Sequence, residues 1–139
     1  MEQKFYVCHR CGNLITKLRE GKSPVVCCGE IMEKIISGTT DAVMEKHLPV
    51  CAVENGKIHV SIGETTHPME NAHYIEWIAL RTGTGIYCKY LSPQKIPQAS
   101  FSIGEGEQIK AVYANDKCGK VRLNILPITF HNLLLFFLF

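Results

Sequence analysis

The sequence has little net charge of either sign. Its 139 residues carry 15 Lys and Arg against 13 Asp and Glu, which gives a formal net charge of +2 at pH 7. Proteins whose main activity is nucleic-acid binding present a strongly basic face. The charge therefore excludes nucleic acid as the main partner, while 46% hydrophobic and 20% charged residues are typical of a globular protein.

Long hydrophobic runs are also scarce. The longest one closes the chain, from Leu133 to Phe139, and Asn132, His131 and Pro127 interrupt the sequence before it. A membrane-spanning helix needs about 20 consecutive apolar residues, so we expect no membrane span. No basic, apolar and small-residue sequence opens the chain, so we expect no secretory signal and predict a cytoplasmic location.

The first 36 residues contain too few apolar side chains to fold by hydrophobic burial alone. Their apolar content is small beyond Phe5–Val7, Leu14, Ile15, Val25 and Val26. A bound metal would supply the missing folding free energy. The small polar stretch from Ser37 to Asp41 is typical of a linker. We therefore predict a metal-binding module over residues 1–36 and a second domain over residues 37–139.

Cysteine is abundant, and its placement indicates a metal site. Four of the seven cysteines fall in the first 28 residues, and an odd total argues against a fully paired disulfide framework. Cys8 and Cys11 form a C-x-x-C pair, and the adjacent Cys27 and Cys28 follow after fifteen residues. Four thiolates can hold one zinc or iron in a tetrahedron. The alternative is a mixture of buried thiols or disulfides.

The remaining sequence is typical of an antiparallel β-sandwich. Asn55-Gly56 is a strong signal for a two-residue hairpin turn. The region shows no convincing helical stripe, and its short strands between Gly, Pro and Ser turns favour an immunoglobulin-like sandwich. On the strand beginning at His73 we expect Ile75, Trp77 and Ala79 to share one face. The predicted strands are Pro49–Val53, Lys57–Ile62, His73–Leu80, Ile86–Leu91, Ala99–Ile103 and Gln108–Tyr113.

Several further cysteines and histidines lie in this second domain. Cys51 and Cys88 sit in apolar strand sequences, so we expect both to be small core residues. His47, His67 and His73 occur in distinctive settings, and Pro68 restricts His67 to an extended backbone. Each histidine alone is more often a satisfied or exposed side chain, but together they form a candidate iron site, because a sandwich can gather residues from separate loops.

These motifs resemble those of a known family. Cys8-His9-Arg10-Cys11-Gly12-Asn13 and Val26-Cys27-Cys28-Gly29-Glu30 look like the desulforedoxin module. Glu45-Lys46-His47-Leu48-Pro49, His67-Pro68-Met69-Glu70 and His73-Tyr74-Ile75-Glu76-Trp77 are similar to the superoxide reductase signature, in the same order. The chain is thereby identified as a member of the desulfoferrodoxin and superoxide reductase family.

The resemblance implies two iron sites and an oxidoreductase activity. It implies a rubredoxin-like iron held by the four N-terminal cysteines, and a second iron held by four histidines and one axial cysteine, with His47, His67 and His73 as three of the equatorial ligands. Lys46 would attract superoxide, and Glu45 would fill the sixth position of the oxidised iron. The implied reaction is one-electron reduction of superoxide to hydrogen peroxide, with electrons from a rubredoxin-like donor, in a homodimer. In isolation, Glu45 and Lys46 would be a solvated charged pair.

The sequence departs from the family pattern after about Ala114. The family has a Cys-Asn-x-His-Gly segment at this place, whereas Cys118 here is followed by Gly119, Lys120 and Val121. We take Cys118 as the candidate axial ligand, and His131 as a weaker candidate for the fourth histidine. Two alternatives to the reductase remain: an iron-binding electron-transfer protein without a complete catalytic site, and a zinc-ribbon interaction protein.

Overall fold

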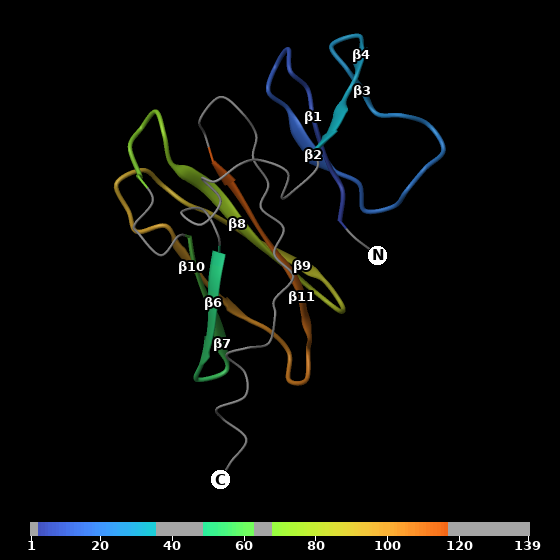
Figure 1. The fold of residues 1–139 in the computed structure, drawn as a ribbon. Coiled ribbons are helices and arrows are strands. Elements are labelled where there is room, and N and C mark those ends of the chain that lie inside the picture. Colours follow the sequence, from blue (N-terminus) through green and yellow to red (C-terminus); the bar gives the residue numbers. More distant parts are fainter. Residues whose placement is uncertain (1–2, 36–48, 63–67, 117–139) are drawn as a thin grey trace. The chain divides into compact units, whose positions relative to one another are not determined.

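The computed structural model describes residues 3–35, 49–62 and 68–116. The chain separates into two compact units, Met1–Ile36 and Ser37–Phe139. Every regular element in the described ranges is a strand, as expected for an all-β protein, and the sheets are antiparallel (Figure 1). No helix in these ranges is long and apolar enough to cross a membrane.

The first unit consists of a small sheet and a short ribbon. Strand β1 (Phe5–Val7) lies between β2 (Leu14–Thr16) and β5 (Glu33–Ile35), while β3 (Val26–Cys27) pairs with β4 (Glu30–Ile31). The buried hydrophobic side chains of this unit are Phe5, Val7, Cys8 and Met32. So small an apolar core supports the inference that this unit needs a further source of stability.

The second unit contains two three-stranded sheets. One has the order β10-β7-β6 and the other the order β11-β8-β9. Five of the six strands overlap their predicted ranges to within two residues at either end, and the sixth extends three residues further at its C-terminal end. Their bounds are β6 Pro49–Glu54, β7 Lys57–Ile62, β8 Ile75–Thr82, β9 Ile86–Tyr90, β10 Gln98–Ser102 and β11 Ile109–Asp116.

The turn between β6 and β7 has the conformation that its sequence predicts. Asn55 and Gly56 have φ values of 50° and 72°, and Glu54 pairs with Lys57 across the turn. Positive φ at both central residues is what a type I′ turn requires. This turn sets the register of the hairpin, which continues to the pair Pro49 and Ile62.

The two sheets enclose one hydrophobic core. Its buried members come from four strands, and Cys51, Met69, Tyr87 and Leu91 are among the partly buried side chains that pack against it. Side chains from both sheets in one cluster define a β-sandwich, which confirms the predicted fold class. The core residues are Ile58, Val60, Ile62, Ile75, Ile78, Leu80, Ala99, Phe101, Val112 and Ala114.

The expected alternation along β8 is wrong at its start. Ile75 packs in the core with Ile78 and Leu80, not on the face of Trp77. The register explains the difference, because Asn115 pairs with Trp77 while the next residue, Asp116, pairs with Ile75. Glu76 is therefore an extra residue on β8. Such a bulge reverses the side-chain alternation, which period-two reasoning cannot detect.

The carboxylate of Glu107 ties two loops of the sandwich together. It accepts hydrogen bonds from the hydroxyls of Thr82 and Thr84, from the Gly104 N–H at 3.0 Å and from the Tyr87 hydroxyl at 3.2 Å. These donors, Thr82 first, lower the pKa of Glu107 from 4.5 to about 2. The ionised form of Glu107 therefore links the β8–β9 turn to the turn before β11.

We predict that Glu107→Gln lowers the melting temperature at neutral pH, because an amide nitrogen cannot accept these hydrogen bonds. A carboxyl group whose pKa is lowered by folding stabilises the fold at any pH above its ordinary pKa. This stabilisation is lost as the pH falls toward the pKa of the folded state. The difference in melting temperature between the two proteins should therefore shrink between pH 4.5 and about 2. Glu105→Gln, at an exposed site in the same turn, is the control; equal losses in both variants would contradict the prediction.

Candidate metal centre

The first pair of cysteines lies on a tight turn after β1. The Gly12 N–H donates to the Cys8 carbonyl at 2.8 Å, and the Cys8 N–H donates to the Asn13 carbonyl at 2.9 Å. Gly12 has a φ of 78°, a conformation that costs glycine little. The turn carries the side chains of Cys8 and Cys11 toward the same point.

The second pair lies on the turn between β3 and β4. Neighbouring side chains on an extended backbone point to opposite faces, so adjacent cysteines can share a metal only where the backbone bends. Cys28 and Gly29 have φ values of 52° and 79°, and Cys27 pairs with Glu30 across them. The left-handed conformation of Cys28 supplies this bend.

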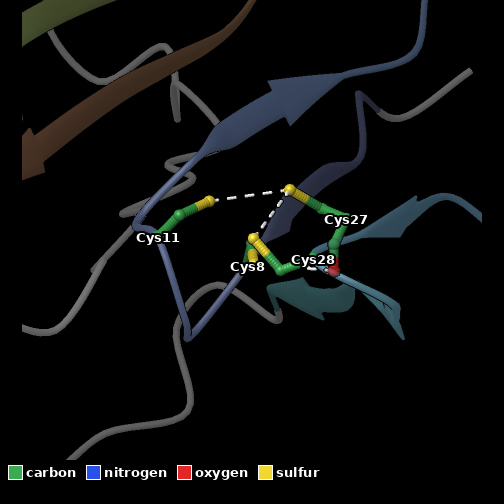
Figure 2. A group of neighbouring side chains, drawn as sticks. All are labelled: Cys8, Cys11, Cys27 and Cys28. Atoms are coloured by element: carbon green, nitrogen blue, oxygen red, sulfur yellow. Dashed lines mark hydrogen bonds between the residues drawn. The ribbon is translucent and has the colours of Figure 1, made fainter.

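The four sulfur atoms converge as a metal site requires (Figure 2). The Sγ atoms of Cys8, Cys11, Cys27 and Cys28 all lie within 4.8 Å of one another. The Cys11 and Cys27 sulfurs are 3.6 Å apart, and those of Cys27 and Cys28 are 3.9 Å apart. A tetrahedron with metal–sulfur bonds of about 2.3 Å has edges of about 3.8 Å. The geometry therefore fits a tetrathiolate metal, and it suits iron and zinc equally.

The thiols influence one another's ionisation. The backbone N–H groups of Cys11 and Arg10 lower the pKa of Cys8 to about 7. Asn13 donates to the Cys27 sulfur, which lowers its pKa, but the Cys11 and Cys8 thiols outweigh this and raise the pKa of Cys27. The thiols of Cys11, Cys27 and Cys8 raise the pKa of Cys28 to about 12. A bound metal cation would stabilise the deprotonated cysteines, because thiolates are the species that bind it.

Polar neighbours surround the centre. Asn13 Nδ2 donates to the Cys27 sulfur at 3.5 Å, a role that the sequence analysis missed although Asn13 follows the C-x-x-C-Gly turn directly. His9 Nε2 lies 2.7 Å from Glu33 Oε2, and Arg10 lies 2.7 Å from Glu30. These pairs are exposed and join the first turn to strands β4 and β5.

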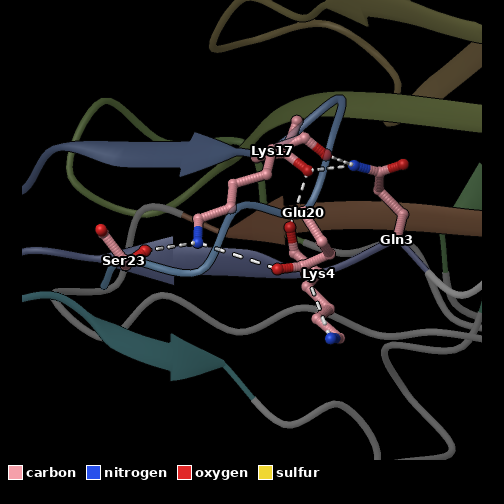
Figure 3. A network of polar contacts seen from close by, with 6 residues as sticks. Gln3, Lys4, Lys17, Glu20 and Ser23 are labelled. Atoms are coloured by element: carbon pink, nitrogen blue, oxygen red, sulfur yellow. Dashed lines mark hydrogen bonds and ion pairs between the residues drawn. The ribbon is translucent and has the colours of Figure 1, made fainter. Parts of the chain in front are cut away.

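Hydrogen bonds and ion pairs anchor the long loop between the two cysteine pairs (Figure 3). Lys17 Nζ donates to the Ser23 carbonyl at 3.3 Å and lies 3.8 Å from Glu20, which in turn lies 3.1 Å from Lys4 Nζ. Gln3 Nε2 donates to the Lys17 carbonyl at 2.8 Å. This network connects β1 to the segment that leads to Cys27, so it helps to place the second cysteine pair where the apolar core is small.

The second predicted site falls mainly outside the described residues. Glu45, Lys46, His47, His67 and Cys118 all lie there. The structure describes His73, whose side chain is half-buried and whose backbone N–H and carbonyl bond with Glu70 at 3.0 and 2.9 Å. It also describes the strand ends that adjoin the segments with the other predicted ligands.

Four strand ends that are close in sequence to the predicted ligands lie at one end of the sandwich. His47 precedes β6, His67 follows β7, His73 precedes β8 and Cys118 follows β11. Pro49 at the start of β6 pairs with Ile62 at the end of β7, and Ile75 at the start of β8 pairs with Asp116 at the end of β11. Figure 1 shows both pairs of ends on the same side of the unit.

The other two described cysteines differ in their surroundings. Cys51 is partly buried against the core, and burial raises its pKa to about 11, as expected of a core thiol. Cys88 is exposed, so its assignment to the core is wrong. The reason is that β9 is an edge strand and Cys88, opposite Ala79, faces away from the core.

We predict that Cys28→Ser loses the metal of the first unit or binds it much more weakly, because a neutral hydroxyl cannot replace a thiolate ligand. Metal content per chain and the circular dichroism of the sandwich are the measurements. Cys88→Ser, at an exposed cysteine of the second unit, should keep full metal content. Unchanged metal content in Cys28→Ser would refute the assignment.

We also predict that metal affinity at this centre rises steeply with pH. Both raised thiols, Cys27 and Cys28, must lose their protons when the metal binds. Release of at least two protons makes the dissociation constant fall by about a hundredfold per pH unit between pH 6 and 8. Competition with a chelator of known affinity measures this slope, and a flat profile would show that metal binding releases no protons from these thiols.

Comparison with known proteins places the chain in a family. The family described as Desulfoferrodoxin matches residues 39–121, and the one described as Desulfoferrodoxin, N-terminal domain matches residues 1–35. The desulfoferrodoxin of Nitratidesulfovibrio vulgaris is 38% identical over 114 residues, which cover 82% of this chain and 90% of that protein. The desulfoferrodoxin of Syntrophotalea carbinolica is 39% identical over 110 residues, covering 79% and 87%.

A solved structure agrees with these matches. The superoxide reductase from Treponema pallidum superposes with a TM-score of 0.71 at 27% identity, covering 88% of this chain and 97% of that one. The likeness therefore includes the order of the two units and the all-strand fold. Together with the matches over residues 1–35 and 39–121, it shows that the chain belongs to the desulfoferrodoxin family.

Proposed function

We propose that the chain is a superoxide reductase that works at a mononuclear non-haem iron in its second unit. The reaction joins superoxide, one electron and two protons to give hydrogen peroxide. Family membership and the likeness to the Treponema pallidum superoxide reductase support this proposal. The observation that carries it is that four strand ends, two to five residues from the predicted ligands, lie at the same end of the sandwich (Figure 1).

His47, His67 and His73 would hold the iron as imidazole ligands, and Cys118 would provide a thiolate ligand. Pro49 pairs with Ile62, so the segments that carry His47 and His67 leave the first sheet from neighbouring strands. Ile75 pairs with Asp116, so the segments that carry His73 and Cys118 adjoin neighbouring strands of the second sheet. Bound iron would supply the single electron that superoxide takes up.

The charged residues next to His47 would handle the substrate. Superoxide is an anion, so the ammonium group of Lys46 draws it in and offsets the negative charge that builds as the electron arrives. Glu45 would supply a carboxylate ligand for the oxidised iron. Both roles follow from the family resemblance and from the position of these residues before β6.

The first unit holds iron in this proposal and serves as an electron-transfer or structural centre. Its four converged sulfurs support a rubredoxin-like site. The donor would be a small rubredoxin-like protein, and the enzyme would work as a homodimer in the cytoplasm. A reduced donor of this kind delivers one electron at a time, which matches the stoichiometry of the reaction.

A second candidate function is an iron-binding electron carrier without a complete catalytic site. One observation favours it: Cys118 is followed by Gly119, Lys120 and Val121, so this segment lacks the histidine that the family pattern has there. The second iron would then lack its fourth histidine ligand. A carrier would keep the tetrathiolate centre and turn over no superoxide.

Iron content and superoxide turnover separate these functions. The reductase should bind two irons per chain and consume superoxide with stoichiometric formation of hydrogen peroxide and no release of dioxygen. The carrier should bind one iron and show no turnover. One zinc per chain without colour would contradict both functions and favour a zinc-ribbon interaction protein.

We predict that Lys46→Ile slows the second-order reaction with superoxide by about tenfold and flattens its dependence on ionic strength, because charge steering is screened by salt. Lys46→Arg keeps the charge and should retain most of the rate. Pulse radiolysis at several salt concentrations measures both quantities. Equal rates and equal salt slopes in the two variants would argue against a steering role.

We predict that Cys118→Ala abolishes the sulfur-to-iron charge-transfer band of the second centre, since that band requires an axial thiolate. The absorption spectrum of the N-terminal centre should remain, because its four thiols lie in a separate unit. Cys88→Ser is the matched control. Survival of the band in Cys118→Ala would exclude Cys118 as the ligand, and its absence from the unaltered protein would favour the carrier.

A further inference from the structure

The four cysteines of the first unit differ in what donates hydrogen bonds to their sulfurs. Cys8 is buried, and backbone N–H groups of the first turn donate to its sulfur. Cys11 and Cys28 are exposed, so water can donate to them. Cys27 is half-buried and receives its hydrogen bond from the side chain of Asn13, whose Nδ2 atom lies 3.5 Å from the Cys27 Sγ atom. A side-chain donor, unlike a backbone donor, can be removed by substitution.

The contact between Asn13 and Cys27 is of a kind that persists when a metal binds. The Cys27 sulfur also lies 3.6 Å from the Cys11 sulfur and 3.9 Å from the Cys28 sulfur, but these thiols lose their protons when they become ligands. The amide of Asn13 keeps both of its protons, and its nitrogen rather than its oxygen faces the sulfur. Asn13 is therefore a donor to the thiolate form of Cys27.

The backbone holds Asn13 in place independently of its side chain. The Cys8 N–H donates to the Asn13 carbonyl at 2.9 Å, and any residue at this position offers the same carbonyl. Asn13 is exposed, so its side chain adds little to the apolar core of the unit. Two exposed ion pairs also join the first turn to strands β4 and β5. A substitution at position 13 should therefore remove the sulfur contact and leave the fold intact.

We propose that Asn13 raises the reduction potential of the tetrathiolate iron by donating a hydrogen bond to Cys27. This inference rests on the iron content proposed for the first unit. The centre carries one more negative charge when the iron is ferrous than when it is ferric, and a hydrogen bond to a thiolate stabilises the more negative state more strongly. Asn13 acts through Cys27, as a residue that tunes a metal ligand, and makes the centre easier to reduce by a one-electron donor.

A redox titration of the iron-loaded full chain measures this effect. Asn13→Leu keeps a side chain of similar size and removes the donor. We expect the equilibrium constant for reduction of the centre to fall about tenfold, which corresponds to about 59 mV for one electron. Asn13→Asp keeps the shape of the side chain but presents a carboxylate to the thiolate, so the potential should fall at least as far. The absorption that is lost in Cys28→Ser identifies the first centre in the spectrum of the full chain.

The sulfur-to-iron charge-transfer band gives a second readout that needs no redox titration. A hydrogen bond lowers the energy of the sulfur lone pairs, so its loss in Asn13→Leu should move the band of the ferric centre to longer wavelength. Gln3→Leu is the matched control, because it removes a side-chain amide of the same unit that donates to Thr16 and to the Lys17 carbonyl rather than to a cysteine. Its potential and its band should stay unchanged.

Equal potentials in the unaltered protein and in Asn13→Leu, with iron bound in both, overturn the proposal. An equal fall in Asn13→Leu and Gln3→Leu also overturns it, because the amide of Asn13 then acts only through the stability of the unit. Failure of the first unit to take up iron on reconstitution overturns it together with the proposed iron centre. Loss of superoxide turnover alone contradicts only the proposed reaction, since that reaction belongs to the second unit.

Discussion

The packing of two three-stranded sheets against each other is the constraint on which the second unit depends. Ten buried side chains from β7, β8, β10 and β11 form one cluster, and removal of apolar area from water is the main driving force for such an arrangement. The packing also fixes which strand ends become neighbours. Because β6 starts beside the end of β7 and β8 starts beside the end of β11, four segments that are distant in sequence leave the sandwich on the same side.

The first unit is organised in a different way. Its few buried apolar residues cannot hold two turns in place, and short polar contacts such as those of Glu20 and Lys17 take part of that role. The turns themselves rely on left-handed backbone at Gly12, Cys28 and Gly29. Neighbouring thiols raise the pKa of Cys27 and of Cys28, so a bound cation would stabilise the deprotonated thiolates. Metal binding would then be coupled to the folding of this unit.

The sheet β11-β8-β9 connects the core to the strand ends beside the candidate iron site. The bulge at Glu76 turns Ile75 into the core, two residues after His73. The carboxylate of Glu76 also accepts a hydrogen bond from the Asn115 side chain. Strand β11 thus has one face in the core and the buried side chains of Tyr113 and Asn115 on the other, and its C-terminal end pairs with the start of β8.

The sequence by itself determined the local features of this protein. The Asn55-Gly56 turn, the strand sequences and the pairing of the N-terminal cysteines as C-x-x-C and Cys-Cys are local features, because backbone preferences and short spacings act over a few residues. Tertiary structure alone decided the bulge at Glu76, the exposure of Cys88 on an edge strand and the burial of Trp77 and Tyr113 on the face opposite the core. These features depend on which strand lies next to which and on what covers a sheet, and such contacts between distant residues leave no periodic signal in the chain.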